Sequence, residues 1–218
     1  MRRLFVETPL PFEEAAQWAT DDELTTARSF STARGCEYLA WRAIVRRELG
    51  RDTAIAYNSV GAPVLINRSL YISVSHCRER IAVALSDMPC AVDIERTDRD
   101  FSRALPRYLS PEEQRSSTHP RFPAVAWCAK EVLYKYAGRR ELDLLRDLHI
   151  DGIRWPSRLS TFPALLSANP SAMPSSPRLD GIPADTAWGS IHSHDAEGSP
   201  RTLHFYQYEG FVVVFLFD

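Results

Sequence analysis

Residues 90–95, CAVDIE, decide the expected fold because they join a buried strand to two acidic side chains. Side chains alternate between the two faces of a strand, so Asp93 and Glu95 point to one face while Val92 and Ile94 point into the core. Two neighbouring carboxylates repel each other unless a cation lies between them. Oxygen ligands at this spacing suit Mg²⁺. Taken alone, the pattern is more typical of a solvated strand edge without a function than of a metal site.

A second motif is expected on a helix over about 122–137, which Gly138 would end. This helix contains WCAKEVLYK at residues 127–135, where Trp127, Glu131 and Lys135 recur every four residues and share one helix face. Taken alone, a glutamate and a lysine at this spacing are more typical of an ordinary surface ion pair. The motif gains meaning only together with the acidic strand.

A third motif, SVSHC at residues 73–77, is predicted to lie at the end of a strand. It places the Ser75 hydroxyl and the His76 imidazole at the turn, where both could contact a phosphate. A structural role for such a strand end is the alternative, and the residues alone favour that alternative.

The remaining elements predict an α+β fold. Capping-box patterns predict helix starts at Thr20 and Ser110. A longer helix is predicted over about 33–49, ended by Gly50, with a polar side formed by Arg42, Arg46 and Arg47. Short segments rich in β-branched and aromatic residues predict strands at 4–7, 54–59, 63–67, 70–76, 81–87, 90–95, 186–193, 201–208 and 211–218.

The order of these elements predicts two similar α/β halves related by a pseudo-two-fold axis, each a small antiparallel sheet packed on helices. The first half would cover residues 1–90, and the second, with the acidic strand and the 122–137 helix, residues 91–218. Residues 156–183 hold six of the fifteen prolines and are predicted to form a loop-rich insertion on the surface.

Composition narrows the class of protein. The formal net charge is −2, which argues against nucleic-acid binding. No apolar run reaches the length of a membrane span, and no signal peptide is recognisable, so a cytoplasmic protein without membrane partners is expected. The four cysteines form no CxxC pair and are expected to be reduced, buried thiols: Cys36, Cys77, Cys90 and Cys128.

The three motifs, in this order, resemble the 4′-phosphopantetheinyl transferase superfamily, whose members carry an SHS-like turn, a G-[IV]-D-[IV]-E strand and a W-x-x-K-E-x-x-x-K helix. The resemblance covers about 28–140 well and the C-terminal strands weakly. The chain length is similar to that of the monomeric, surfactin-synthetase-activating type, so a monomer is expected. The two-half architecture follows mostly from this resemblance.

The resemblance implies a metal site and a catalytic pair. Asp93, Glu95 and Glu131 would hold Mg²⁺, or Mn²⁺, together with the pyrophosphate of coenzyme A. Glu131 would also accept the proton of a serine hydroxyl, directly or through a water molecule, and Lys135 would stabilise charge on the departing phosphate. Metal contact lowers the basicity of a carboxylate, which favours the water-mediated route.

The resemblance also implies contacts to the rest of the cofactor. Ser75 and His76 would contact its phosphate end, and Arg28 and Arg34 lie where family members keep basic residues for the 3′-phosphate. Two departures stand out: Ala91 replaces the family glycine before the acidic strand, and Ala62 replaces the lysine of a G-K-P segment that meets the nucleotide. Substitutes for that lysine could be Arg68, Arg46 or Arg47.

The implied activity is Mg²⁺-dependent transfer of 4′-phosphopantetheine from coenzyme A to a serine of an apo acyl or peptidyl carrier protein, with release of 3′,5′-ADP. This holo-carrier-protein synthesis would serve fatty acid, polyketide or nonribosomal peptide biosynthesis. Two alternatives remain: a coenzyme A or nucleotide-binding module without activity, and a Mg²⁺-dependent pyrophosphate hydrolase in which water replaces the serine.

Overall fold

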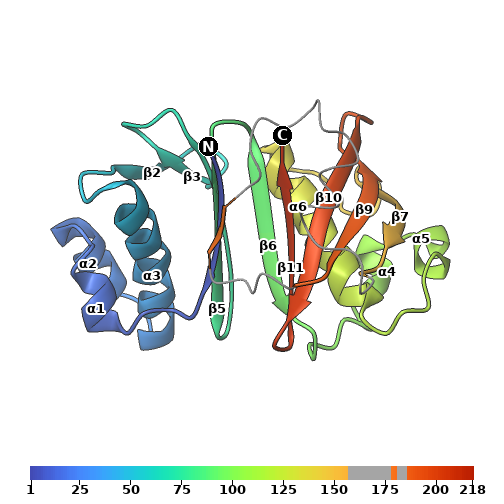
Figure 1. Ribbon diagram of the computed structural model, residues 1–218, viewed down its shortest axis with the longest axis horizontal. Coiled ribbons are helices and arrows are strands. Elements are labelled where there is room, and N and C mark those ends of the chain that lie inside the picture. The colour runs from blue at the N-terminus through green and yellow to red at the C-terminus, as the bar shows by residue number, and fades with distance from the viewer. Residues whose placement is uncertain (157–177, 181–185) are drawn as a thin grey trace.

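The structure is a computed structural model that describes residues 1–156, 178–180 and 186–218. Its two larger sheets lie side by side, each with helices packed on it (Figure 1), and the predicted α+β class is confirmed. Except for β8, which runs parallel to β1, neighbouring strands of the described chain are antiparallel. The proposed pseudo-two-fold axis and the exact limits of the two halves stay predictions.

The first sheet has the order β4 (Tyr71–Cys77), β5 (Arg80–Ser86), β1 (Arg2–Glu7) and β8 (Arg178–Asp180). The second sheet has the order β6 (Cys90–Arg96), β11 (Phe211–Phe217), β10 (Pro200–Tyr208), β9 (Trp188–His194) and β7 (His149–Arg154). A separate hairpin pairs β2 (Ile55–Tyr57) with β3 (Pro63–Leu65). The helices are α1 (Phe12–Ala16), α2 (Asp21–Arg28), α3 (Thr32–Leu49), α4 (Leu105–Tyr108), α5 (Pro111–Arg115) and α6 (Phe122–Ala137).

Helix ends follow the local sequence signals. Thr20 and Ser110 both form complete capping boxes, with Glu23 and Glu113 as the reciprocal partners. Helix α6 ends at Gly138, whose φ of 61° lies in the left-handed region that glycine adopts without strain. Helices α3 and α6 therefore begin and end within a residue of the predicted limits.

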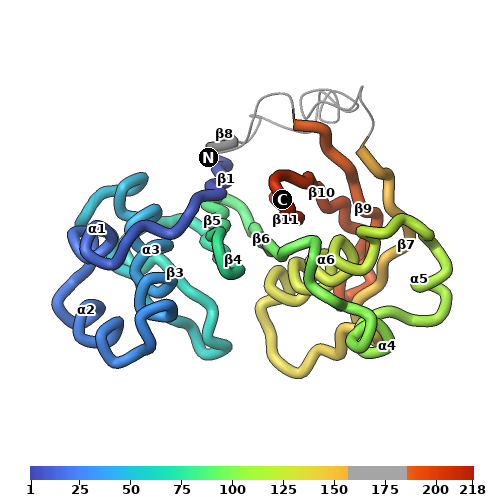
Figure 2. The backbone as a smooth tube through the Cα atoms, turned by 90° about the horizontal axis from the view of Figure 1, so that it is seen from below, coloured from blue at the N-terminus to red at the C-terminus, as the bar shows by residue number. Residues whose placement is uncertain are grey.

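Three apolar layers hold the two sheets and the two long helices together. Helix α3 packs on β5 and β1, and α6 packs on β6 and β11. Between them, β1 and β5 meet β6, β10 and β11 through a third layer that includes Leu4, Val92 and Ile94. Figures 1 and 2 both show the resulting order across the molecule: α3, β5, β6, α6. The site-bearing strand β6 thus lies at the junction of the two sheets.

The prediction that three arginines form the polar side of α3 is wrong for two of them. Arg42 and Arg46 are 2% and 3% exposed, and both pair with the carboxylate of Glu23 from α2. Arg42 also stacks its guanidinium on the Tyr38 ring, 3.5 Å from the ring centroid. These charges can be buried because every one has a partner. Only Arg47, paired with Glu7, lies at the surface.

Several other expectations are changed. The short elements α1, α4 and β7 were not predicted, nor was β8, which falls inside the expected 156–183 insertion. Apart from residue 156 and residues 178–180, that insertion lies outside the described residues. All four cysteines are free, but Cys36 and Cys77 are only half-buried. In the described part of the chain, none of the helices has the length and apolar character needed to cross a membrane.

Candidate active site

Strand β6 carries the first two site residues, with the alternation that its sequence predicts. Val92 and Ile94 are buried in the layer between the sheets. Ala91 packs in the other core, on the side of helix α6, so Asp93 and Glu95 share that side. Asp93 is only 5% exposed. The expected solvated strand edge is therefore not what the fold provides for this carboxylate.

Helix α6 brings Glu131 and Lys135 against the same strand. The Lys135 Nζ donates to the Val92 carbonyl oxygen at 3.0 Å and to Asp93 Oδ1 at 2.7 Å. The side chain of Trp127, one turn before Glu131, lies close enough to Glu95 to help lower the pKa of that carboxyl. The helix face predicted from the four-residue spacing therefore does meet the acidic strand. The Glu131–Lys135 pair is not an ordinary surface pair.

Strand β4 contacts β6 through serine hydroxyls and not through backbone-to-backbone hydrogen bonds. Ser73 Oγ accepts from the Val92 N–H at 3.1 Å, and Ser75 Oγ accepts from the Ile94 N–H at 3.3 Å. The Ser75 hydroxyl also donates to Asp93 Oδ1 at 2.7 Å. These contacts satisfy backbone donors of β6 that no strand of its own sheet reaches. They also fix the Asp93 carboxylate, so Ser75 is a positioning residue in this structure.

The two oxygens of Asp93 differ. Oδ1 receives the hydroxyl of Ser75 and the ammonium of Lys135. Oδ2 is buried and accepts from no nitrogen or hydroxyl of the described residues. The fully buried Cys128 thiol contacts the same carboxylate but is a weak donor, and burial raises its pKa far above the usual range. A buried carboxylate oxygen left in this way has unused capacity for a cation.

Among the residues that the structure describes, Glu95 and Glu131 are the two carboxylates with raised pKa values. Burial is the main cause in both cases, and the charge of Asp93 raises both values further. Arg99 opposes the shift at Glu95, with which it forms an ion pair, and Lys135 opposes it at Glu131. The charge of Asp93 therefore destabilises the charged forms of Glu95 and Glu131, and the nearby cations offset this only in part.

The histidine of β4 lies beside one of the two predicted arginines. Arg34 Nη1 lies 2.9 Å from His76 Nε2, and Glu37 lies 3.4 Å from His76 Nδ1. Burial first, and the charges of Arg34 and Lys135 next, lower the pKa of His76. Its neutral form can then accept from Arg34 on Nε2. Arg28 is exposed in the last turn of α2, and no contact in the described residues joins it to these groups.

The structure also tests the expected substitutes for the missing loop lysine. Arg46 is buried against Glu23, Arg47 pairs with Glu7, and Arg68 pairs with Asp52. None of these three contacts lies at the acidic strand. Sequence reasoning missed Arg99, although its position four residues after Glu95 was a signal available beforehand.

A divalent cation fits the chemistry of this donor set. In residues 1–156, 178–180 and 186–218, no group of three or more His, Cys, Asp or Glu side chains is arranged to hold a metal ion as it stands. The unused oxygen of Asp93, the raised pKa values of Glu95 and Glu131, and the cations Lys135 and Arg99 set against them all indicate a need for positive charge. Hard carboxylate oxygens are the ligands that Mg²⁺ takes.

Comparison with known proteins relates part of this chain to a family. A search of the curated proteins finds no similar sequence. The family model described as the 4′-phosphopantetheinyl transferase superfamily matches residues 89–176, which include β6 and α6. The more specific surfactin-synthetase-activating type stays a prediction. Over residues 89–176 the chain thus matches the 4′-phosphopantetheinyl transferase superfamily, as its motifs predicted, and this match indicates phosphopantetheinyl transfer in general.

Proposed function

We propose that the protein transfers 4′-phosphopantetheine from coenzyme A to a serine of an apo acyl or peptidyl carrier protein, with Mg²⁺, and releases 3′,5′-ADP. The observation that carries this proposal is the meeting of Asp93, Glu131 and Lys135 at the junction of β4, β6 and α6. Phosphoryl transfer needs positioning and charge neutralisation more than covalent help from the protein. Three acids with two cations beside them supply both.

The proposed reaction exchanges one phosphorus–oxygen bond for another. The serine oxygen of the carrier protein forms a bond to the phosphorus that bears the pantetheine. The bond between that phosphorus and the bridging oxygen of the pyrophosphate breaks, and 3′,5′-ADP leaves with the bridging oxygen. The serine proton passes to Glu131, directly or through a water molecule. Burial raises the pKa of Glu131, which makes its carboxylate a better proton acceptor.

The other residues hold and neutralise the cofactor in this proposal. Mg²⁺, held by Asp93, Glu95 and Glu131, would neutralise charge on the pyrophosphate. Lys135 already binds Asp93, so its Nζ lies where it can also contact the departing phosphate. Ser75 fixes Asp93, and His76 with Arg34 can contact a phosphate group. The exposed Arg28 has no support from the described contacts beyond its position in α2.

The experiment is a carrier-modification assay. The protein is incubated with Mg²⁺, coenzyme A and either a fatty-acid-type or a peptide-synthetase-type apo carrier, and the carrier is analysed by mass spectrometry. We expect a gain equal to one phosphopantetheine on the acceptor serine, and no gain when that serine is alanine. Omitting Mg²⁺ should abolish the gain, and Mn²⁺ is expected to restore it.

The same assay separates the two alternatives. A pyrophosphate hydrolase would release 3′,5′-ADP without any carrier. A binding module would bind coenzyme A and leave both cofactor and carrier intact. Either result with both carrier types would overturn the proposal. We also propose that the protein acts as a monomer in the cytoplasm. Sedimentation analysis of the purified chain tests the monomeric state.

A further inference from the structure

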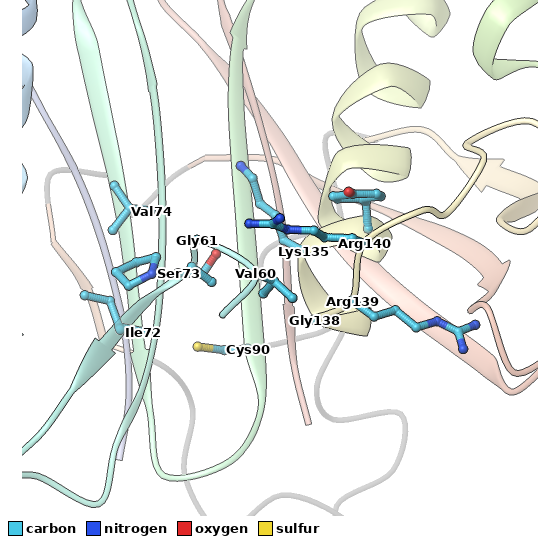
Figure 3. A pocket seen from close by; sticks show the side chains of 13 residues that line it. Val60, Gly61, Ile72, Ser73, Val74, Cys90, Lys135, Gly138, Arg139 and Arg140 are labelled. Carbon is cyan, nitrogen blue, oxygen red and sulfur yellow. The ribbon is translucent and has the colours of Figure 1, made fainter. Parts of the chain in front are cut away.

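A pocket of about 260 Å³ lies between the two halves, next to the candidate active site. One wall is the loop before β3, with Val60 and Ala62, together with Pro63 at the start of β3. The opposite wall is the end of α6, with Lys135, and the residues that follow Gly138 (Figure 3). The pocket therefore connects the acidic strand with the loop in which alanine replaces the expected lysine.

The loop wall offers this pocket no backbone donors. Asn58 Oδ1 accepts from the N–H groups of Val60 and Ala62, at 3.1 and 2.9 Å. The Asn58 carbonyl oxygen accepts from the Gly61 N–H at 3.0 Å. Proline has no N–H group. An anion in the pocket cannot be held by this loop, as it could be by a loop with free amides, so its partner has to be a side chain on the other wall.

Two arginines follow α6, and they point in different directions. Figure 3 shows the Arg140 side chain extending into the pocket beside Lys135, whereas the Arg139 side chain points away from it. Arg139 pairs with Glu197 at 3.3 Å. Arg140 is exposed and, within the part of the chain that the structure describes, has no carboxylate partner. Lys135 is engaged by Asp93, so Arg140 is the cation with its full donor capacity available here.

We propose that Arg140 binds a phosphate group of the nucleotide end of coenzyme A and so replaces the lysine absent from position 62. This inference rests on the proposed function, because it takes coenzyme A as the ligand. The planar guanidinium offers parallel donors that match two phosphate oxygens. The apolar loop wall opposite suits the flat face of a base. One pocket thus offers an apolar surface and a cation to one nucleotide.

Binding measurements without carrier protein test this role apart from catalysis. Isothermal titration calorimetry is run on the full chain with 3′,5′-ADP, coenzyme A and dephospho-coenzyme A, for the wild type and for Arg140→Gln. We expect Arg140→Gln to weaken coenzyme A binding about tenfold or more, the scale of a lost hydrogen bond to a charged group. Arg139→Gln is the matched control and should change binding less than about twofold.

The ligands distinguish which phosphate is bound. Weakened binding of coenzyme A and 3′,5′-ADP but not of dephospho-coenzyme A assigns Arg140 to the 3′-phosphate. An equal loss for coenzyme A and dephospho-coenzyme A assigns it to the pyrophosphate. In either case, Ala62→Lys added to Arg140→Gln should restore much of the affinity by returning a cation across the same pocket.

Two results would overturn the inference, and they differ in whether the proposed function fails as well. If Arg140→Gln binds all three ligands as the wild type does, Arg140 has no such role, and the proposed transfer stands on its own assay. If the wild type binds none of the ligands and modifies no carrier, both the inference and the proposed function fail. Thermal melting of each variant confirms that the exposed substitutions leave the fold intact.

Discussion

Helices α3 and α6 hold comparable positions against their two sheets, yet their charged side chains are paired to different extents. On α3, Arg42 and Arg46 are buried around the carboxylate of Glu23, and backbone carbonyls and a tyrosine hydroxyl accept their remaining donors. On α6, Glu131 and Lys135 face a strand whose Asp93 keeps an unused buried oxygen. Within the described residues, the first arrangement pairs its buried charges fully, whereas the second leaves one buried carboxylate oxygen without a donor.

The pKa values of the carboxylates show the same difference. Burial alone would raise the pKa of Glu23, but hydrogen bonds from Arg46 and the Thr20 N–H, and the charges of both arginines, lower it. At Glu95 and Glu131 burial prevails, and the pKa values are raised. A fold tolerates buried charges that are fully paired and loses stability when one partner is removed, whereas carboxylates kept partly uncompensated are typical of functional sites.

The largest expected effect is on stability and concerns the complete cluster. Glu23→Gln should lower the free energy of unfolding by about 3–5 kcal/mol, because it leaves two buried arginines without a counter-charge. Glutamine can keep the capping-box contact to Thr20, so the loss reports the charge and not the cap. Urea denaturation measures it. A loss below about 1 kcal/mol would show that the cluster is not fully desolvated. The substitution should leave the turnover of the folded fraction unchanged.

The second prediction concerns the incomplete side. Glu131→Gln should lower turnover in the carrier assay by about 100-fold or more, the scale for removing one preorganised charged group from a site. The fold should persist, because glutamine has the same shape and Glu131 is only half-buried. Glu112→Gln, an exposed change on α5, is the control. Near-normal turnover with Mg²⁺ dependence intact would remove Glu131 from its proposed role.

The difference between the helices also marks what could be predicted from the sequence. Periodicity placed Glu131 and Lys135 on one helix face, and alternation placed Asp93 and Glu95 on one side of β6. Both signals are local, and both hold. The pairing of Arg42 and Arg46 with Glu23 joins residues about twenty positions apart, and no local pattern encodes it. The spacing of those arginines was therefore assigned to a polar surface, which was wrong.

Contacts across the junction could not be predicted either. The hydroxyls of Ser73 and Ser75 meet the N–H groups of β6 because of how the two sheets pack. The family resemblance implied a phosphate contact for Ser75, which stays a prediction, and the structure shows the Ser75 hydroxyl on Asp93. Arg140 likewise acquires its position from the way α6 ends against the loop before β3. The sequence thus predicted which face of strand and helix the acids occupy but not the groups that hold them.

The third prediction compares two lysines of α6. Lys135→Met should reduce turnover about tenfold or more, since it removes a hydrogen-bonding cation from the reacting phosphates and from Asp93. Lys130→Met is the matched change: Lys130 is fully buried on Glu113, away from β6. It should lower stability and leave turnover of the folded protein close to that of the wild type. Equal losses of turnover in the two variants would contradict the division of roles.

The smallest predicted effect is on the pH dependence of stability in the metal-free protein. A carboxylate with a raised pKa binds more protons in the folded than in the unfolded state, so its contribution to stability falls as pH rises from the unfolded to the folded pKa. Glu131 belongs to this class, and Glu23, with a lowered pKa, to the opposite one. Glu131→Gln should therefore raise Tm slightly at pH 7 in EDTA, whereas Glu23→Gln lowers it.

The size and direction of this effect can be checked against Mg²⁺. About 1 kcal/mol corresponds to roughly 2–4 °C in Tm for a chain of this length, so the rise for Glu131→Gln should be a few degrees or less. It should disappear as the pH falls below the unfolded pKa, because the Glu131 carboxyl is then protonated in the folded and the unfolded states alike. Mg²⁺ added at pH 7 should stabilise the wild type more than Glu131→Gln, since the cation then pairs with the carboxylate. A wild type whose Tm does not respond to Mg²⁺, with or without coenzyme A, would mean that Lys135 and Arg99 already provide all the positive charge that the three acids need.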